Sequence, residues 1–139
     1  MKAAVAEQFD QYGRYHQHVG NRLAHIIGFP LIAVGVLSLT QAGLGSTGAL
    51  VAQGLFAVVN VTTSRRLGLI CTVVVLGLWG IAVALPIAVG VVCLSVGVGA
   101  PVLTHVLLEK RWPATLAQFL AFERVGHLWF LGRWLDLTP

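Results

Sequence analysis

The sequence predicts an all-α integral membrane protein whose four transmembrane helices form two hairpins, with interfacial helices before and after them. The first observation is composition: of 139 residues, 57% are hydrophobic and only 10% are charged. Soluble domains carry about 25% charged residues, so this chain cannot cover a water-facing surface. The second is that residues 26–64 and 67–104 contain no acidic, basic or histidine residue. We expect a single membrane domain, made of the parts 1–23, 24–108 and 109–139.

The N-terminal part reads as a short amphipathic helix up to Tyr15. Val5, Phe9 and Tyr12 recur at helical spacing, with polar residues between them. This pattern is typical of a helix that lies on a membrane surface and leads into the histidine-rich stretch that follows. The part lacks the short apolar core of a secretory signal peptide.

Each uncharged block is just under forty residues long, and one membrane-spanning helix needs about 20 residues. Each block therefore fits a hairpin of two spans better than one helix. The glycine-rich residues 43–48 offer a turn in the first block, and Pro86 favours a break in the second. The predicted helices are 24–43, 48–64, 67–85 and 87–108.

The basic residues support this count, because all nine lie before the first helix, between the two hairpins or after the fourth helix. They are Lys2, Arg14, Arg22, Arg65, Arg66, Lys110, Arg111, Arg124 and Arg133. The positive-inside rule then places both termini in the cytoplasm, in a bacterial inner membrane or an ER-type membrane. The charges are few and scattered, which argues against a nucleic-acid partner.

The tail after Pro113 alternates apolar and charged residues and predicts one or two interfacial helices, with Trp129 and Trp134 at headgroup depth. A fifth span is the alternative. The charged pair Glu123 and Arg124 and the nearby His127 argue against it, because ionisable groups are costly within a bilayer.

Four spans bring all five histidines to the cytoplasmic face, which is the main indication of a site. His105 and Glu109 are four residues apart and share a helix face, and Asn21 lies on the face that carries His18 and His25. His16 and His25 are nine apart, so they can share a ligand only if the chain bends, for which Gly20 offers a place.

These spacings make His16, His25 and His105 the leading candidates for metal ligands, with His18, His127 and Glu109 as further ones. Imidazole with an optional carboxylate suits iron, zinc, copper or nickel. A headgroup-facing role for any single histidine is the competing interpretation.

Two segments carry a resemblance to a known family. The first runs from Tyr15-His16 through Asn21, His25 and Gly28 to Pro30. The second runs from His105 through Glu109-Lys110-Arg111 to Pro113-Ala114. In order and internal spacing they resemble the paired motifs of the Mpo1-like family of small membrane proteins, whose yeast member is an Fe(II)-dependent 2-hydroxy fatty acid dioxygenase.

The resemblance implies that the chain uses Fe(II) and O₂ to shorten a 2-hydroxy fatty acid by one carbon. It makes His16, His25 and His105 iron ligands and Glu109 a ligand or a carboxylate that orients one. Asn21 would fix the loop or a ligand. Arg22, Lys110 or Arg111 would hold the substrate carboxylate, and the apolar bundle would take the acyl chain.

Two other classes of function remain open from the residues alone. One is a non-catalytic membrane protein that binds lipid or assists assembly. The other is a metal-binding membrane protein of another kind. In either case the partners of the chain can include further copies of itself, in a homo-oligomer. Transport is disfavoured, because no ionisable residue lies in the middle of the predicted spans.

Overall fold

The computed structural model describes residues 3–112 and 116–135, with side chains for 4–112 and 125–135. All regular structure in these residues is helical, as the composition predicts. The helices are α1 (Ala3–Tyr15), α2 (Val19–Thr63), α3 (Arg65–Ala82), α4 (Ile87–Leu108) and α5 (Leu116–Trp134). Pro113, Ala114 and the side chains of Glu123 and Arg124 lie outside the described parts.

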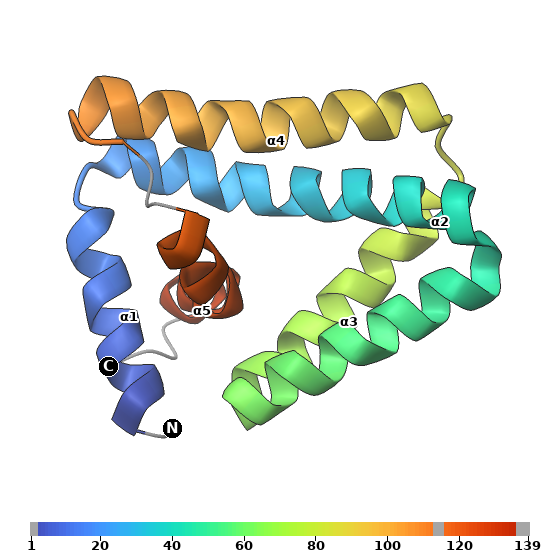
Figure 1. Ribbon diagram of the computed structural model, residues 1–139, viewed down its shortest axis with the longest axis horizontal. Coiled ribbons are helices and arrows are strands. Elements are labelled where there is room, and N and C mark those ends of the chain that lie inside the picture. The colour runs from blue at the N-terminus through green and yellow to red at the C-terminus, as the bar shows by residue number, and fades with distance from the viewer. Residues whose placement is uncertain (1–2, 113–115, 136–139) are drawn as a thin grey trace.

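Helix α2 consists of two halves, because its backbone turns sharply at Gly45. This residue has φ 66° and ψ −179°, a conformation that glycine alone adopts readily. The break falls inside the turn predicted over residues 43–48. In Figure 1 the two halves of α2 diverge from this point.

Helices α2, α3 and α4 are the described helices that are long and apolar enough to cross a membrane. They also turn much of their apolar surface outward. Val73 on α3 is 69% exposed and Leu107 on α4 is 67% exposed, which is expected when lipid covers them. The chain is thus built as a membrane protein. The count of four spans, which requires both halves of α2 to cross, stays a prediction.

Helix α4 packs along the first half of α2 through glycines on both helices. A Cβ on Gly28 would lie 2.8 Å from the Gly97 oxygen, and one on Gly35 would lie 2.7 Å from the Gly90 oxygen. Such distances are too short for any side chain, so these positions allow the two backbones to touch. Small residues are the usual means of close helix packing in lipid.

Helix α3 packs along the second half of α2, where a Cβ on Gly68 would collide with the Asn60 backbone at 2.4 Å. The pairing in space therefore differs from two successive hairpins. Figure 1 shows α4 running antiparallel to the first half of α2, and α3 antiparallel to its second half. Glycine positions, rather than sequence order, select these neighbours.

Helix α1 buries its predicted apolar face against α5. Val5, Phe9 and Tyr12 are 8%, 4% and 5% exposed and form one core with Leu128 and Phe130. The predicted helix is confirmed, whereas its location on a membrane surface stays a prediction.

The tail forms one helix, α5, which lies inside the angle between α1 and the long helices (Figure 1). The sequence placed both Trp129 and Trp134 at headgroup depth. Trp134 is 73% exposed and fits that role, but Trp129 is only 8% exposed. The expectation for Trp129 was wrong, because its ring packs 5.5 Å from the Tyr12 ring in the contact between α1 and α5.

Candidate metal centre

Three histidines from three helix ends meet at one point. His16 follows the last residue of α1, His25 lies in the second turn of α2, and His105 lies in the last turn of α4. The chain bends at residues 16–18, between α1 and α2. It does not bend at Gly20, as the sequence suggested, because Gly20 is already helical. Instead, a Cβ on Gly20 would lie 2.8 Å from Leu108 Cδ1, so this glycine allows α2 to approach the end of α4.

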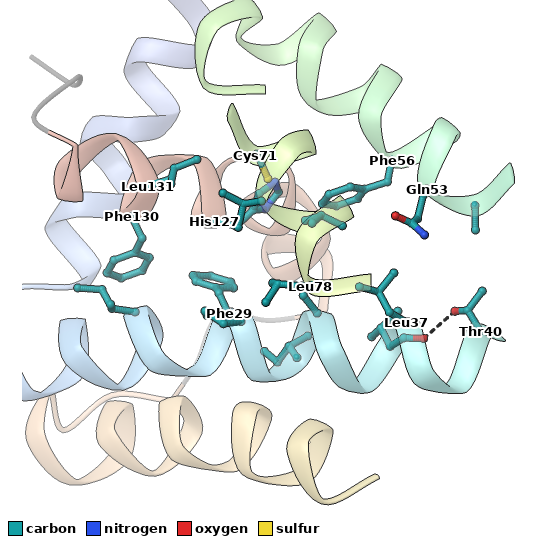
Figure 2. Close-up of a pocket in the computed structure, with 18 of the residues that line it drawn as sticks. Phe29, Leu37, Thr40, Gln53, Phe56, Cys71, Leu78, His127, Phe130 and Leu131 are labelled. Atoms are coloured by element: carbon teal, nitrogen blue, oxygen red, sulfur yellow. Dashed lines mark hydrogen bonds between the residues drawn. The ribbon is translucent and has the colours of Figure 1, made fainter. Parts of the chain in front are cut away.

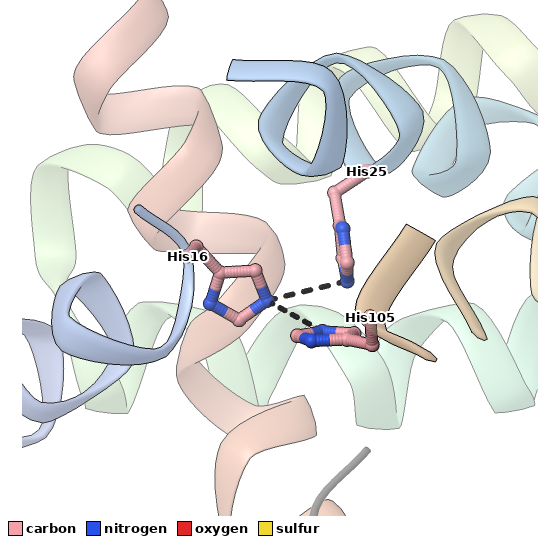
Figure 3. A group of neighbouring side chains, drawn as sticks. All are labelled: His16, His25 and His105. Carbon is pink, nitrogen blue, oxygen red and sulfur yellow. Dashed lines mark hydrogen bonds between the residues drawn. The ribbon is translucent and has the colours of Figure 1, made fainter. Parts of the chain in front are cut away.

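The three rings point their Nε2 atoms at one another (Figure 3). His16 Nε2 lies 3.3 Å from His25 Nε2 and 3.1 Å from His105 Nε2. Nitrogen ligands about 2.0–2.1 Å from a metal ion lie about 2.8–3.4 Å apart in octahedral or tetrahedral geometry. The two distances from His16 Nε2 fall in this range, and the ligand atoms of all three histidines lie within 4.8 Å of one another, so the group could hold a single metal ion. Three protein ligands also leave coordination positions open, as in catalytic sites.

Backbone carbonyls fix the orientation of two of these rings. His16 Nδ1–H donates to the Tyr12 oxygen at 2.8 Å, and His25 Nδ1–H donates to the Asn21 oxygen at 2.9 Å. A proton on Nδ1 leaves the lone pair of each Nε2 directed at the centre. Partners of this kind hold metal-binding imidazoles in the required tautomer.

Asn21 connects the third ring to its surroundings. Its side chain is fully buried, and its amide nitrogen lies 3.3 Å from His105 Nδ1 and 3.4 Å from Glu109 Oε1. Its amide oxygen accepts from the Thr104 hydroxyl at 2.9 Å. The same residue thus contacts His25 through its backbone and His105 through its side chain.

The centre is closed by aromatic rings. Tyr12 stacks on His16 at 4.0 Å and Phe130 stacks on His25 at 5.2 Å. The three imidazoles are 5%, 7% and 8% exposed. Burial lowers the pKa of His16 to about 3, because a charged ring would lose its hydration, and the neighbouring His25 and His105 act in the same direction. His16 is therefore neutral at physiological pH, as a metal ligand must be.

Glu109 and His18 lie beside the triad rather than in it. The Glu109 carboxylate accepts from the His18 backbone N–H at 2.7 Å. Burial would raise the pKa of Glu109, but this bond and the contact with Asn21 outweigh it and hold the pKa below its usual range. The His18 ring caps α2, since its Nδ1 accepts from the Gly20 N–H at 3.0 Å.

His127 lies elsewhere, where its Nε2–H donates to Asn60 Oδ1 and its ring faces Phe29 and Phe56. Both His127 and Phe56 line an apolar cavity of about 530 Å³ between α2, α3 and α5 (Figure 2). Phe130 also lines this cavity and separates it from the triad, since the same ring stacks on His25.

A second, polar cavity of about 540 Å³ lies beside His16 and Arg22. Of the basic residues that the sequence proposed for a substrate, Arg22 alone lines it. Lys110 and Arg111 follow the end of α4, where Lys110 has φ 52° and the Arg111 N–H donates to the His105 oxygen. Neither lines either of these two cavities.

The model of one family matches residues 2–136, nearly the whole chain, and its description is 2-hydroxy-palmitic acid dioxygenase Mpo1-like. The chain belongs to the Mpo1-like family. No curated protein and no solved structure matches it. The resemblance seen in the two paired motifs is therefore confirmed, and the motif residues His16, Asn21, His25, His105 and Glu109 lie in or beside the histidine triad.

Sequence reasoning missed the residues that α5 and α1 bring to the centre. Phe130 and Trp129 were assigned to a membrane interface, and Arg133 was used only to orient the chain. Helical spacing joins Trp129 to Arg133, four residues apart on one face. That spacing was visible in the sequence, but nothing in it indicated that this face meets α1.

Proposed function

We propose that this chain is an Fe(II)-dependent dioxygenase that shortens 2-hydroxy fatty acids by one carbon. The observation that carries the proposal is the convergence of three buried Nε2 atoms at ligand spacing, in a chain of the Mpo1-like family. Imidazole nitrogens suit several metals, and the family description supports iron among them. When bound, Fe(II) would supply the activation of O₂ next to a chelating 2-hydroxy carboxylate.

In this proposal the chain's own residues hold the centre and exclude water from it. His16, His25 and His105 are the ligands, and Tyr12 and Phe130 cover two of the rings. The acyl chain would reach the apolar cavity by displacing the Phe130 ring, which lies between that cavity and His25, and about 530 Å³ lies within the usual range of ligand pockets. The proposal keeps four spans, with both termini in the cytoplasm, as the positive-inside rule favours.

Asn21 would set the tautomer of His105. With the Asn21 amide nitrogen donating to Nδ1, the ring proton of His105 lies on Nε2, which suits the 3.1 Å contact with His16. Metal binding through Nε2 needs the proton on Nδ1. A half-turn of the Asn21 amide would allow its oxygen to accept from His105 Nδ1–H and its nitrogen to donate to the Thr104 hydroxyl. The 3.4 Å contact between the amide nitrogen and Glu109 would then be lost.

Two measurements test the proposal. Detergent-purified protein should contain about one iron per chain, and His16→Ala, His25→Ala and His105→Ala should each lose it. His18→Ala is the matched control, because this histidine lies two residues from His16 but outside the triad. Incubation with a long-chain 2-hydroxy fatty acid, Fe(II) and O₂ should yield the acid shortened by one carbon. A metal-free protein that yields no such product would contradict the proposal and favour a non-catalytic lipid-binding role.

A further inference from the structure

The polar cavity beside His16 is built from α1, the start of α2 and α5. Its lining includes the triad member His16, the aromatic Trp129 and most of the charges found near the centre. The charged residues are Asp10, Arg14, Arg22 and Arg133. This lining has three guanidinium groups and one carboxylate, so the cavity favours an anion.

One of the three guanidinium groups is already neutralised. Arg14 donates to Asp10 Oδ2 at 2.7 Å, and the two side chains form an ion pair four residues apart on α1. Within the described residues, Arg22 and Arg133 form no ion pair. The positive charge that remains for a ligand therefore lies on Arg22 and Arg133.

Each guanidinium group is close to a triad histidine, Arg133 through Trp129 and Arg22 along α2. Arg133 lies 5.9 Å above the Trp129 ring in a cation–π contact, and that ring lies 6.2 Å from the His16 ring. Arg22 stands three residues before His25, on the adjoining turn of α2. Both guanidinium groups and His16 line the same cavity, so an anion bound there would lie beside the triad.

We propose that Arg22 and Arg133 bind the carboxylate of the acyl substrate in this cavity, with the acid itself identified by the proposed function. Guanidinium groups match a carboxylate with paired, charge-assisted hydrogen bonds. This assignment replaces Lys110 and Arg111, which lie at the end of α4 and line neither cavity. It also adds Arg133, a residue that lies outside both family motifs.

The test measures equilibrium binding to iron-loaded protein in detergent without oxygen, so that no turnover occurs. The probes are a long-chain 2-hydroxy acid and the matched 1,2-diol, which lacks the carboxylate. Arg22→Gln and Arg133→Gln should each weaken binding of the acid about tenfold, because each removes a charge-assisted pair. Binding of the diol and iron content should stay unchanged.

The matched control is the double variant Asp10→Asn/Arg14→Gln, which removes a neutral pair from the same cavity and preserves its net charge. It should bind the acid as the wild type does. Equal losses for acid and diol in Arg22→Gln and Arg133→Gln would overturn the proposal, since they would indicate a structural role. Loss of acid binding in Lys110→Gln or Arg111→Gln instead would place the anion at the end of α4.

A lipid phosphate shares the chemistry of a carboxylate, so a second arm adds an anionic phospholipid to the micelles. It should displace the acid weakly. If the phospholipid displaces the acid as strongly as unlabelled acid does, and Arg133→Gln abolishes this displacement, the cavity is a headgroup site and the assignment is overturned. If the acid binds in an arginine-dependent way but no shortened product forms, the proposed function alone is contradicted. If product forms and the two arginine variants bind the acid as the wild type does, this inference alone is contradicted.

Discussion

Replacing Gly97 with alanine should separate two of the candidate ligands without touching either. A Cβ on Gly97 would lie 2.8 Å from the Ile32 nitrogen and 2.9 Å from the Gly28 oxygen. Carbon atoms in contact prefer about 3.5–4.0 Å, so α2 and α4 would have to move apart by roughly 0.6–1 Å. The obstacle is backbone on both counts and cannot turn away.

This separation would act directly on the centre. His25 stands one turn before Gly28, and His105 stands two turns after Gly97. Metal sites tolerate about 0.2 Å in ligand distance, so we expect a loss of at least tenfold in metal affinity. Overpacking should also cost about 1–3 kcal/mol in the free energy of unfolding.

Gly99→Ala is the matched control, because it lies on the same helix and no atom lies within 4 Å of its Cβ position. It should retain the metal and be as stable as the wild type, or more stable by up to about 1 kcal/mol. The assay is metal titration together with thermal unfolding in detergent. If Gly97→Ala and Gly99→Ala behave alike in both, the close packing of α2 and α4 does not set the histidine spacing.

Three further predictions concern single side chains. Asn21→Asp should retain the metal, since a carboxylate can accept from His105 Nδ1–H, whereas Asn21→Leu should weaken binding about 10–100-fold in the same titration. Gln53→Leu should raise the free energy of unfolding by about 1–3 kcal/mol, because both amide atoms of Gln53 are buried and have no hydrogen-bond partner among the described residues. A lower melting temperature of this variant would contradict the prediction. Gly45→Ala should lower the free energy of unfolding by about 1–3 kcal/mol, because residue 45 has φ 66°. Gly43→Ala should leave the free energy of unfolding unchanged, because nothing lies near its Cβ position.

The sequence predicted the helices and the meeting of His16, His25 and His105 for the same reason. Uncharged blocks give the helix lengths, and α4, which runs antiparallel to the first half of α2, returns His105 to His16 and His25. The start of α4 at Ile87 agrees with the prediction because Pro86 is its N-cap residue, whereas the preceding helix α3 ends at Ala82, three residues before the predicted end at 85.

The pairing of helices could not be read from hydrophobicity, since every face of these helices is apolar. In lipid, close packing depends on where small residues match. Gly28 and Gly35 are seven residues apart, as are Gly90 and Gly97, and this equal spacing on two antiparallel helices was the available signal. It is weak in a sequence with 16 glycines, most of which play no such part.

The contribution of α5 was the least predictable, because it depends on a contact between the two ends of the chain. Gly126 on α5 is the point of closest approach, where a Cβ would lie 2.8 Å from the Tyr12 hydroxyl oxygen. The Tyr12 ring cannot yield easily, since it lies between His16 at 4.0 Å and Phe130 at 5.7 Å.

Gly126→Ala should therefore disturb the metal centre from a distance. Tyr12 holds His16 twice, through ring stacking and through its carbonyl oxygen, which accepts from His16 Nδ1–H at 2.8 Å. A displaced Tyr12 would turn His16 Nε2 away from His25 and His105, and metal affinity should fall about tenfold or more. Gly99→Ala again serves as the control. Unchanged metal affinity in Gly126→Ala would show that α1 holds His16 without support from α5, and that the centre belongs to α1, α2 and α4 alone.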